Sequence, residues 1–383
     1  MASLVFLGNC AMPTAVKTAA LSHAPGVPTP SIWHGEDKPP LLRTLFMTQP
    51  GAYLHLHNGR LVVEHEGRVQ LSVPLEKVDQ VSALDEGAIS FAAIRALLER
   101  GGSFLVCGSH GQPSGWLSGA NNAHISLRHM QHGYQNHADF GMNVAQRIVS
   151  GKIANSRLCL RRLQRHRQAE PLAVDAELAD LQRRSVRARS LDSLRGFEGA
   201  AARAYFAAWR QLLPPHWQAH FGARQTQPPR DVVNAMLSYG YAILFQNLLT
   251  LVQQRGLDAH LGHLHAQRDG HPALVSDLME EFRALVVDSV VLHLLQDEAA
   301  APQVSPAVNP DAGKTDNTPK GVYLGKELRK RLIQRLEDKL NSAVTHPLTQ
   351  EKGDYRRMMR TQVGHYIQVL QGECGHYQPF APR

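Results

Sequence analysis

Five ionisable side chains that could support chemistry lie in three separate segments of this sequence. Glu198 lies in LRGFEGAAARAYFAAW, a segment expected to form a helix, with apolar residues beside it. A carboxylate on an apolar face is costly unless it is paired, hydrogen-bonded or bound to a metal. His263 and His265 lie in the loop GLDAHLGHLH. Asp277 and Glu280 follow near the start of a helix, where a spacing of three puts both carboxylates on one face.

Carboxylates and one histidine from different helices form a site of the type that holds Mg²⁺ or Mn²⁺ in octahedral coordination. Such an ion activates a hydroxyl nucleophile and neutralises charge on a transferring phosphoryl group. Each piece also has a structural interpretation. Glu198 could pair with a core arginine, the histidine could be a hydrogen-bonded loop residue, and the two acids could serve a helix dipole. From spacing alone, the structural interpretations are favoured.

Other catalytic motifs fail on their spacing. AGKTD at 312–316 ends like a phosphate-binding P-loop, but Val308 stands where the first glycine of that motif is required. Backbone amides cannot cradle a phosphate without the glycine turn, so nucleotide binding through a P-loop is rejected. No GxSxG elbow supports a serine hydrolase. The four cysteines have no CxxC spacing, which argues against a disulfide framework and a cysteine-type zinc site.

The composition is that of a globular protein with a basic balance. The 383 residues indicate two or three domains, and 43% hydrophobic content excludes a disordered chain. Lysine and arginine number 41 against 33 acids, and the resulting net charge of +8 is compatible with a polyanion partner. No stretch reaches ~18 apolar residues without polar interruption, so we expect no membrane span. Reduced thiols fit a cytoplasmic location.

The first part of the chain has the pattern of a small β-rich domain. Apolar residues alternate from Leu42 to about Gly119, with two-residue turns that are typical of hairpins at Asn58-Gly59 and Glu66-Gly67. This domain is predicted over 42–122 and contains no cluster of catalytic residue types. Residues 1–41, rich in Ala, Pro, Ser and Thr, are predicted to be a poorly ordered extension.

From Ala123 onward the pattern is helical. Asp231 is placed to cap a buried helix that Gly256 ends. Tyr239 in that helix could reach the carboxylates, although a tyrosine bonded within the core is the favoured interpretation. The helices are predicted over 143–167, 194–209, 232–256, 276–296, 325–344 and 353–373, with a Pro-rich loop over 298–320. The predicted fold class is therefore α+β, a small N-terminal β-rich domain followed by a larger all-α domain over 123–383.

The helix over 143–167 carries a basic stripe. Seven arginines and lysines lie between Asp139 and Glu170 with no acid among them, and positions 157, 161 and 165 share one face. This pattern suits a phosphate backbone, but an ordinary solvated face explains it equally well. The residues predicted to contact DNA are Arg147, Lys152, Arg157, Arg161, Arg165, Arg356 and Arg357.

Several segments resemble one family along most of the chain. GFEGAAARAYF, NAMLSYGYAIL, GLDAHLGHLH and DLMEEFRALVVD occur in this order and are similar to the CRISPR-associated spacer-acquisition endonuclease/integrase family. TLFMTQPGAYLHL, GKIANSRLCLRR and DYRRMMRTQVGHYIQVLQGE extend the resemblance from about Leu42 to Phe380. It implies a helical catalytic domain, a homodimer and a small dimeric CRISPR-associated adaptation partner protein. The leader and the Pro-rich stretch depart from the family pattern.

Matched residue by residue, the resemblance assigns the metal ligands. It places the family's metal-binding glutamate at Glu198, its histidine at His265 and its third acidic ligand at Glu280. Asp277 corresponds to an auxiliary acid of the catalytic site. The choice of His265 over His263 rests on the resemblance alone.

The resulting hypothesis is a metal-dependent endonuclease and integrase that acts on double-stranded DNA with Mg²⁺ or Mn²⁺. A 3′-hydroxyl of a captured fragment would attack a phosphodiester of a CRISPR repeat, which inserts the fragment as a spacer. Two alternatives remain open at this stage. One is a metal nuclease that acts on branched or single-stranded nucleic acid, and the other is a non-catalytic DNA-binding scaffold.

Overall fold

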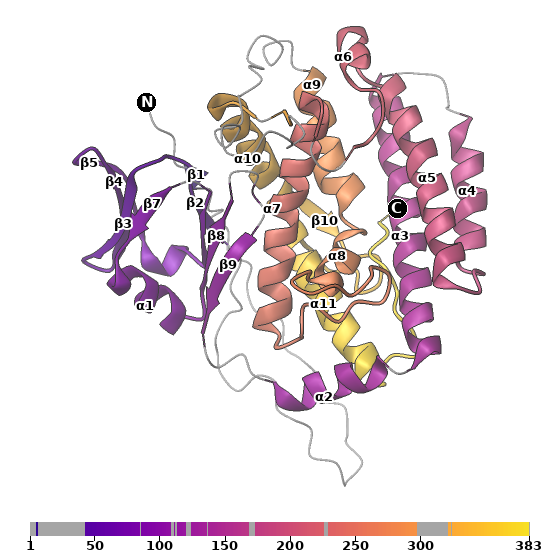
Figure 1. Ribbon diagram of the computed structural model, residues 1–383, viewed down its shortest axis with the longest axis horizontal. Coiled ribbons are helices and arrows are strands. Elements are labelled where there is room, and N and C mark those ends of the chain that lie inside the picture. Colours follow the sequence, from indigo (N-terminus) through magenta and orange to yellow (C-terminus); the bar gives the residue numbers. More distant parts are fainter. Residues whose placement is uncertain are drawn as a thin grey trace.

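A computed structural model describes residues 5–6, 43–84, 86–108, 111, 113–119, 124–135, 137–167, 173–225, 229–296, 321–322 and 324–382. Strands gather at one end of the molecule and helices at the other (Figure 1). Apart from the short strand β1 (Val5–Phe6), the extension predicted over 1–41 lies outside the described residues. The Pro-rich loop predicted over 298–320 also lies outside them.

Strands β1 to β9 form two sheets, a five-stranded sheet of order β1-β2-β6-β8-β9 and a four-stranded sheet of order β5-β4-β3-β7. Their bounds are β2 (Thr44–Met47), β3 (Ala52–His57), β4 (Arg60–His65), β5 (Arg68–Pro74), β6 (Gln80–Ala83), β7 (Gly87–Ile89), β8 (Ser103–Cys107) and β9 (Pro113–Ser118), with the short helices η1 (Leu75–Lys77) and α1 (Phe91–Glu99). Both predicted hairpin turns are confirmed, since Asn58, Gly59, Glu66 and Gly67 all have positive φ.

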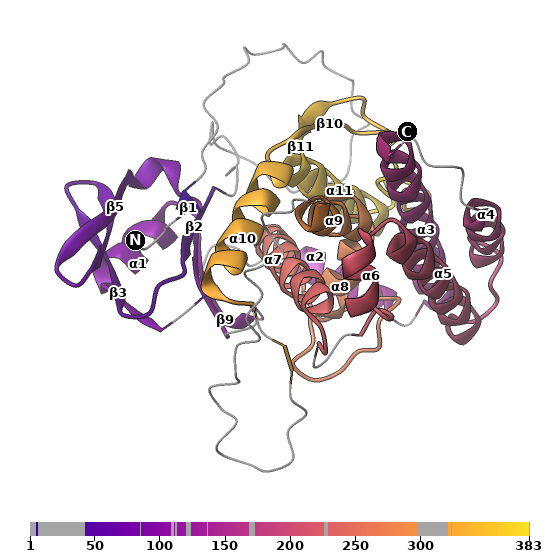
Figure 2. The same cartoon turned by 90° about the horizontal axis from the view of Figure 1, so that it is seen from above.

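The helices surround one long apolar helix, α7 (Val232–Gln254), as Figures 1 and 2 show. The others are α2 (Ile125–Tyr134), α3 (Ala138–Arg167), α4 (Val174–Ser185), α5 (Leu191–Gln211), α6 (Pro215–His220), α8 (Ala273–Met279), η3 (Arg283–Asp288), α9 (Ser289–Gln296), α10 (Lys326–Leu340) and α11 (Tyr355–Leu370). The predicted cap is confirmed, because the Asp231 carboxylate accepts a 2.7 Å bond from the backbone N–H of Asn234. By length and composition alone α7 could span a membrane, but 83% of its most apolar window is buried inside this fold.

The polar residues that interrupt α7 bind it to the five-stranded sheet. Ser82 on β6 donates a 2.9 Å hydrogen bond to the Gln246 side chain. Gln80, two residues earlier on the same face, donates a 2.9 Å bond to the Thr250 hydroxyl. Because these groups are buried, each would be costly without its partner. The interruptions therefore mark the contact between strands and helices.

The structure differs from the predicted helices in two places. The C-terminal part is not all α, because β10 (Ala343–Thr345) and β11 (Lys352–Asp354) pair as a hairpin. Gln350, with φ +57°, and the buried His346 shape the intervening turn. The helix predicted over 276–296 is also interrupted, since α8 ends at Met279 and η3 has the wider turn of a π-helix. Such turns are frequent at functional sites.

Candidate metal and phosphoryl-transfer site

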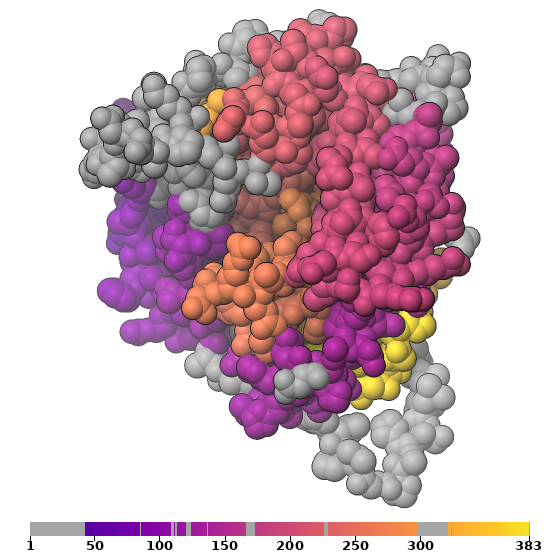
Figure 3. Space-filling view, turned by 45° about the vertical axis from the view of Figure 1, so that its right-hand side comes forward, coloured from indigo at the N-terminus to yellow at the C-terminus, as the bar shows by residue number. Residues whose placement is uncertain are grey.

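Four elements bring the candidate residues together. Helix α3 contributes Lys152 and α5 contributes Glu198. The loop over 257–272 contributes His265, and Asp277 on α8 and Glu280 just after it complete the set. In Figure 3 this loop, coloured orange, reaches the surface beside the pink α5. The interruption after Met279 places Glu280 where the α8 segment meets α3.

Glu280 lies at the centre of the site and is 1% exposed. Its Oε2 lies 2.8 Å from Lys152 Nζ, and its Oε1 accepts a 2.6 Å hydrogen bond from Arg283. His265 Nε2 lies 3.7 Å from the same Oε1. Burial alone would raise the pKa of Glu280, but the charges of Arg283, Lys152 and His265 overcome it and lower that pKa to about 2. Glu280 is therefore held as a carboxylate.

Asp277 organises the loop and the histidine. Its Oδ2 accepts backbone bonds from His263 (2.5 Å) and Leu264 (2.9 Å). Its Oδ1 accepts a 3.0 Å bond from the His265 backbone and lies 2.7 Å from His265 Nδ1. Asp277 thus fixes the imidazole through one nitrogen and leaves Nε2 directed toward Glu280. Carboxylates orient metal-binding histidines in this manner, which agrees with an auxiliary role for Asp277.

The two loop histidines have different environments. His263 Nε2 lies 2.8 Å from the Tyr366 hydroxyl, and burial lowers the pKa of its ring. Burial also acts on His265, but its hydrogen bond to Asp277 and the nearby carboxylates dominate and raise the pKa of that ring. Of the two rings, His265 is the one that lies near Glu280, and its role as a metal ligand stays a prediction.

The Lys152 ammonium lies between the carboxylates of Glu198 and Glu280. Its ammonium donates a short hydrogen bond to Glu198 and also forms an ion pair with Glu280, so one cation bridges the two carboxylates. Within the described part of the chain, no three His, Cys, Asp or Glu side chains are grouped closely enough to hold a metal ion. The chemistry of the donor set nevertheless fits one, because Glu198 and Glu280 share one cation and His265 Nε2 lies 3.7 Å from Glu280.

A cavity of about 170 Å³ adjoins these carboxylates. Asp288, in its wall, accepts hydrogen bonds from Tyr205 (2.8 Å) and Tyr241 (2.5 Å), and burial raises the pKa of its carboxyl. The guanidinium groups of Arg283 and Arg224 lie 4.1 Å and 5.3 Å from the Tyr241 ring centre. The cavity therefore offers positive charge directly beside Glu198 and Glu280.

Sequence reasoning missed several residues of this site. Lys152 was predicted as a DNA contact on the basic stripe, whereas its side chain points toward the acidic centre, which consists of Glu198 and Glu280. Arg283 could have been found, because it follows Glu280 at helical spacing for an ion pair. Tyr239 packs against Gly111 of the strand region, and it is Tyr241 that lines the cavity.

The basic residues predicted to contact DNA lie in different settings. Arg157 forms two 3.1 Å bonds to Asp175 on α4, and Arg161 bonds to the same carboxylate at 2.7 Å. Arg165, the third member of the shared face, is exposed and donates a 3.4 Å hydrogen bond to the Arg161 carbonyl. The stripe, which has no acid among its own residues, therefore obtains one from the next helix.

Of the remaining predicted contacts, Arg356 lies in the core and Arg357 at the surface. The Arg356 side chain is 3% exposed and bonds to Asn247 (2.9 Å), Asn341 (3.0 Å) and Glu337 (2.5 Å). Arg357 is exposed and pairs with Glu351. Arg147 is half-buried on α3. Each guanidinium nitrogen of Arg356 thus donates a hydrogen bond within the fold.

Comparison with known proteins identifies the family. The family model for CRISPR associated protein Cas1 matches residues 45–338. A protein of Thermus thermophilus named CRISPR-associated endonuclease Cas1 1 is 37% identical over 337 residues, which is 88% of this chain and 98% of that protein. This chain belongs to the Cas1 family. The resemblance found in the sequence motifs is thereby confirmed.

Solved structures share the Cas1 fold. A casposase bound to its integration product superposes with a TM-score of 0.75 at 17% identity, covering 88% of this chain and 93% of that one. A chain of a Cas6-RT-Cas1–Cas2 complex gives a TM-score of 0.73 at 23% identity, covering 91% of this chain and 37% of that one. Both show that the arrangement of strands and helices is that of known Cas1-type folds.

Proposed function

We propose that this Cas1-family chain is a metal-dependent DNA endonuclease and integrase that inserts captured DNA fragments as spacers into a CRISPR repeat array. The observation that carries the proposal is that the Lys152 ammonium bridges Glu198 and Glu280 while His265 Nε2 lies 3.7 Å from Glu280. A curated relative is named an endonuclease, and a structural neighbour is bound to an integration product. These names support the same reaction class.

Glu198, Glu280 and His265 would hold Mg²⁺ or Mn²⁺. When bound there, the ion would neutralise charge on the phosphoryl group and activate the attacking hydroxyl. The 3′-oxygen of the fragment would form a bond to a repeat phosphorus as that phosphorus releases its former 3′-oxygen. The attacking hydroxyl loses its proton and the released oxygen gains one. With water as the nucleophile, the same exchange at phosphorus would hydrolyse the phosphodiester and cleave the DNA strand.

The other residues of the site would orient and support this chemistry. Asp277 fixes the His265 ring through Nδ1, so Nε2 is the nitrogen available to a metal. Arg283 holds Glu280 in its ionised form. Lys152 pairs with both carboxylates, so its ammonium marks a position that favours a cation. Arg224 and Arg283 offer positive charge to a phosphate in the adjoining cavity.

We further propose that Arg147 and Arg165 contribute to a backbone-driven, salt-sensitive contact with double-stranded DNA. Arg157, Arg161 and Arg357 would contribute less because each is paired with Asp175 or Glu351, and Arg356 is left out because it is buried. The same proposal includes a β-rich domain over 42–122 and a catalytic domain over 123–383. It also includes a homodimer, a small Cas2-type partner and a cytoplasmic location. The neighbouring Cas1–Cas2 complex supports the partner.

Strand transfer of a labelled duplex into supercoiled repeat DNA tests this function. The protein and its small partner would be assayed with Mn²⁺, with EDTA and with Glu198→Ala, and Glu177→Ala on the exposed face of α4 is the matched control. Product is expected with Mn²⁺ in the wild type and control only. Product that survives Glu198→Ala would refute the site, and DNA binding without product would favour the scaffold.

A further inference from the structure

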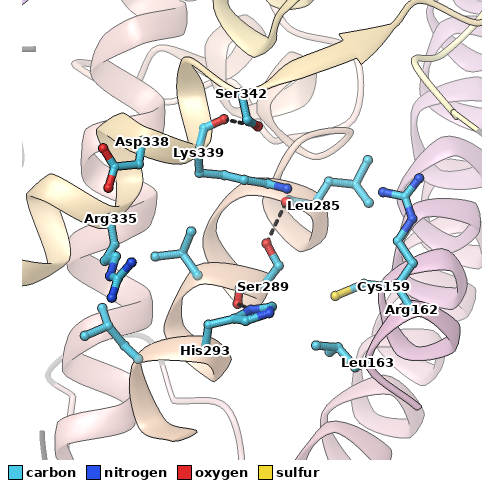
Figure 4. A pocket seen from close by; sticks show the side chains of 12 residues that line it. Cys159, Arg162, Leu163, Leu285, Ser289, His293, Arg335, Asp338, Lys339 and Ser342 are labelled. Carbon is cyan, nitrogen blue, oxygen red and sulfur yellow. Dashed lines mark hydrogen bonds between the residues drawn. The ribbon is translucent and has the colours of Figure 1, made fainter. Parts of the chain in front are cut away.

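A second cavity, of about 650 Å³, lies between α3, α9 and α10 (Figure 4). Among the described residues, it shares no lining residue with the 170 Å³ cavity beside Glu198 and Glu280. On α3, Lys152 and Ser156 face the acidic centre, whereas Cys159 and Leu163, further along the helix, face the second cavity. The second cavity contains none of the residues assigned to phosphoryl transfer.

The floor of this cavity is apolar and chemically inert. Cys159, Leu163, Leu285 and Leu294 are all buried. Burial raises the pKa of the Cys159 thiol to about 12, so this cysteine stays protonated and is not a metal-binding thiolate. The floor therefore suits the uncharged part of a ligand rather than an ion alone.

The walls carry three cations and one acid. Arg162 comes from α3, Arg335 and Lys339 come from α10, and Asp338 is the only carboxylate among the described lining residues. In Figure 4 the Lys339 side chain extends across the cavity toward Arg162. The formal balance of these four side chains is two positive charges. A phosphomonoester carries about the opposite charge near neutral pH.

Lys339 is the cation that most needs a counter-ion. Within the described residues no carboxylate oxygen lies within 4.0 Å of its ammonium, and its recorded contact is the Tyr355 ring, 5.0 Å from Nζ. Burial, and then the charge of Arg162, lower the pKa of Lys339. A partly buried cation beside a second cation is costly unless an anion joins them.

We propose that this cavity binds a phosphomonoester attached to a nucleoside-sized group. Lys339 would supply a point charge, and the guanidinium groups of Arg162 and Arg335 would supply planar donors from opposite walls. The volume lies within the range of small-molecule sites and exceeds what a phosphate needs, so the sugar or base would rest on the apolar floor. A free nucleotide and the 5′-phosphate end of a DNA strand share this chemistry. The proposal does not depend on the integrase activity.

Calorimetric titration of the full-length protein with deoxyadenosine 5′-monophosphate, in EDTA and low salt, tests the site. Lys339→Gln is expected to weaken binding by about tenfold or more, because one charge-assisted contact is lost. Arg335→Gln, at an exposed position that folding tolerates, is expected to weaken it several-fold. Arg68→Gln, an exposed arginine on β5 in the strand region, is the matched control and should bind as the wild type does.

A second arm separates the two sources of the phosphate. Binding of a duplex with a 5′-phosphate is compared with binding of the same duplex with a 5′-hydroxyl, in the wild type and in Arg335→Gln. A preference for the phosphate that Arg335→Gln abolishes identifies a strand end. Nucleotide binding without such a preference identifies a free nucleotide. Absence of both, or equal weakening by Arg68→Gln, overturns the proposal.

Discussion

Glu280 and Glu281 are adjacent and both buried, yet they face opposite regions of the molecule. Glu280 faces α3 and α5, where Lys152, Arg283 and His265 surround it. Glu281 faces the C-terminal tail, where it accepts bonds from Tyr377, Gln362 and Phe380. The first carboxylate is surrounded by cations and the second only by neutral donors.

This difference in partners gives the two acids opposite protonation behaviour. The cations lower the pKa of Glu280 to about 2, whereas burial raises the pKa of Glu281 to about 7 despite its hydrogen bonds. A metal needs the charged form, so the first environment suits a ligand and the second suits a structural clamp for the tail. In this segment neighbouring charge, rather than burial, decides which of the two buried glutamates is ionised.

The largest effect is expected from removing the charge of Glu280. Glu280→Gln keeps the volume but deletes a proposed metal ligand, so strand transfer should fall by about a thousandfold or more. Glu281→Gln is the matched variant and should retain most of the activity per folded molecule. Equal losses in the two variants, measured as initial rates with saturating Mn²⁺, would remove the distinction between them.

Glu281 should instead control how stability depends on pH. Its pKa in the folded protein is about 7, above its ordinary value of 4.5, so the folded state keeps a proton that the unfolded state releases. The contribution of Glu281 to stability therefore falls as pH rises from about 4.5 to 7, by about 3 kcal/mol, and is constant above. Urea unfolding of the wild type and of Glu281→Gln across this range measures it, and parallel pH profiles would contradict it.

Asp277 should affect the metal through His265 rather than by binding it. Asp277→Asn keeps the size but weakens the bonds that orient the imidazole, so Mn²⁺ affinity should fall by about 10- to 100-fold. Calorimetric titration with Mn²⁺ measures this change without relying on activity. An unchanged affinity would mean that the ring keeps its orientation without Asp277.

The smallest effect is expected on the basic face of α3. Arg165→Gln removes an exposed charge, so the slope of log binding constant against log salt for duplex DNA should decrease by about 0.9. Arg157→Gln should change the slope less, because Asp175 already neutralises that guanidinium. The opposite order of the two variants would show that Asp175 releases Arg157 to DNA.

Local signals predicted much of the fold. The Asn58-Gly59 and Glu66-Gly67 turns, the Asp231 cap and the buried helix α7 were all predictable, because each depends on residues close in the chain. The β10–β11 hairpin and the π-turn of η3 were not. Their strands and turns are short, and packing of distant segments stabilises them.

The candidate site, too, could be predicted from the sequence only where its residues are close in the chain. Spacing could put Asp277 and Glu280 on one face, but it could not show that Lys152, over a hundred residues earlier, bridges Glu280 to Glu198. Spacing also could not show that Asp175, on another helix, pairs with Arg157 and Arg161 of the arginine stripe. Charge partners that are distant in sequence are fixed only by the fold. The choice of His265 over His263 came from family resemblance, and the different partners of the two rings are fixed only by the fold.

The most direct test of the central claim is a crystal structure of the protein soaked in Mn²⁺, with anomalous diffraction recorded to locate the ion. We predict one peak between Glu198, Glu280 and His265 Nε2, at about 2.0–2.4 Å from their donor atoms, with the Lys152 ammonium displaced. The peak should be absent from Glu280→Gln crystals and present in Glu281→Gln crystals. A peak elsewhere, with Lys152 still bridging Glu198 and Glu280, would contradict the account.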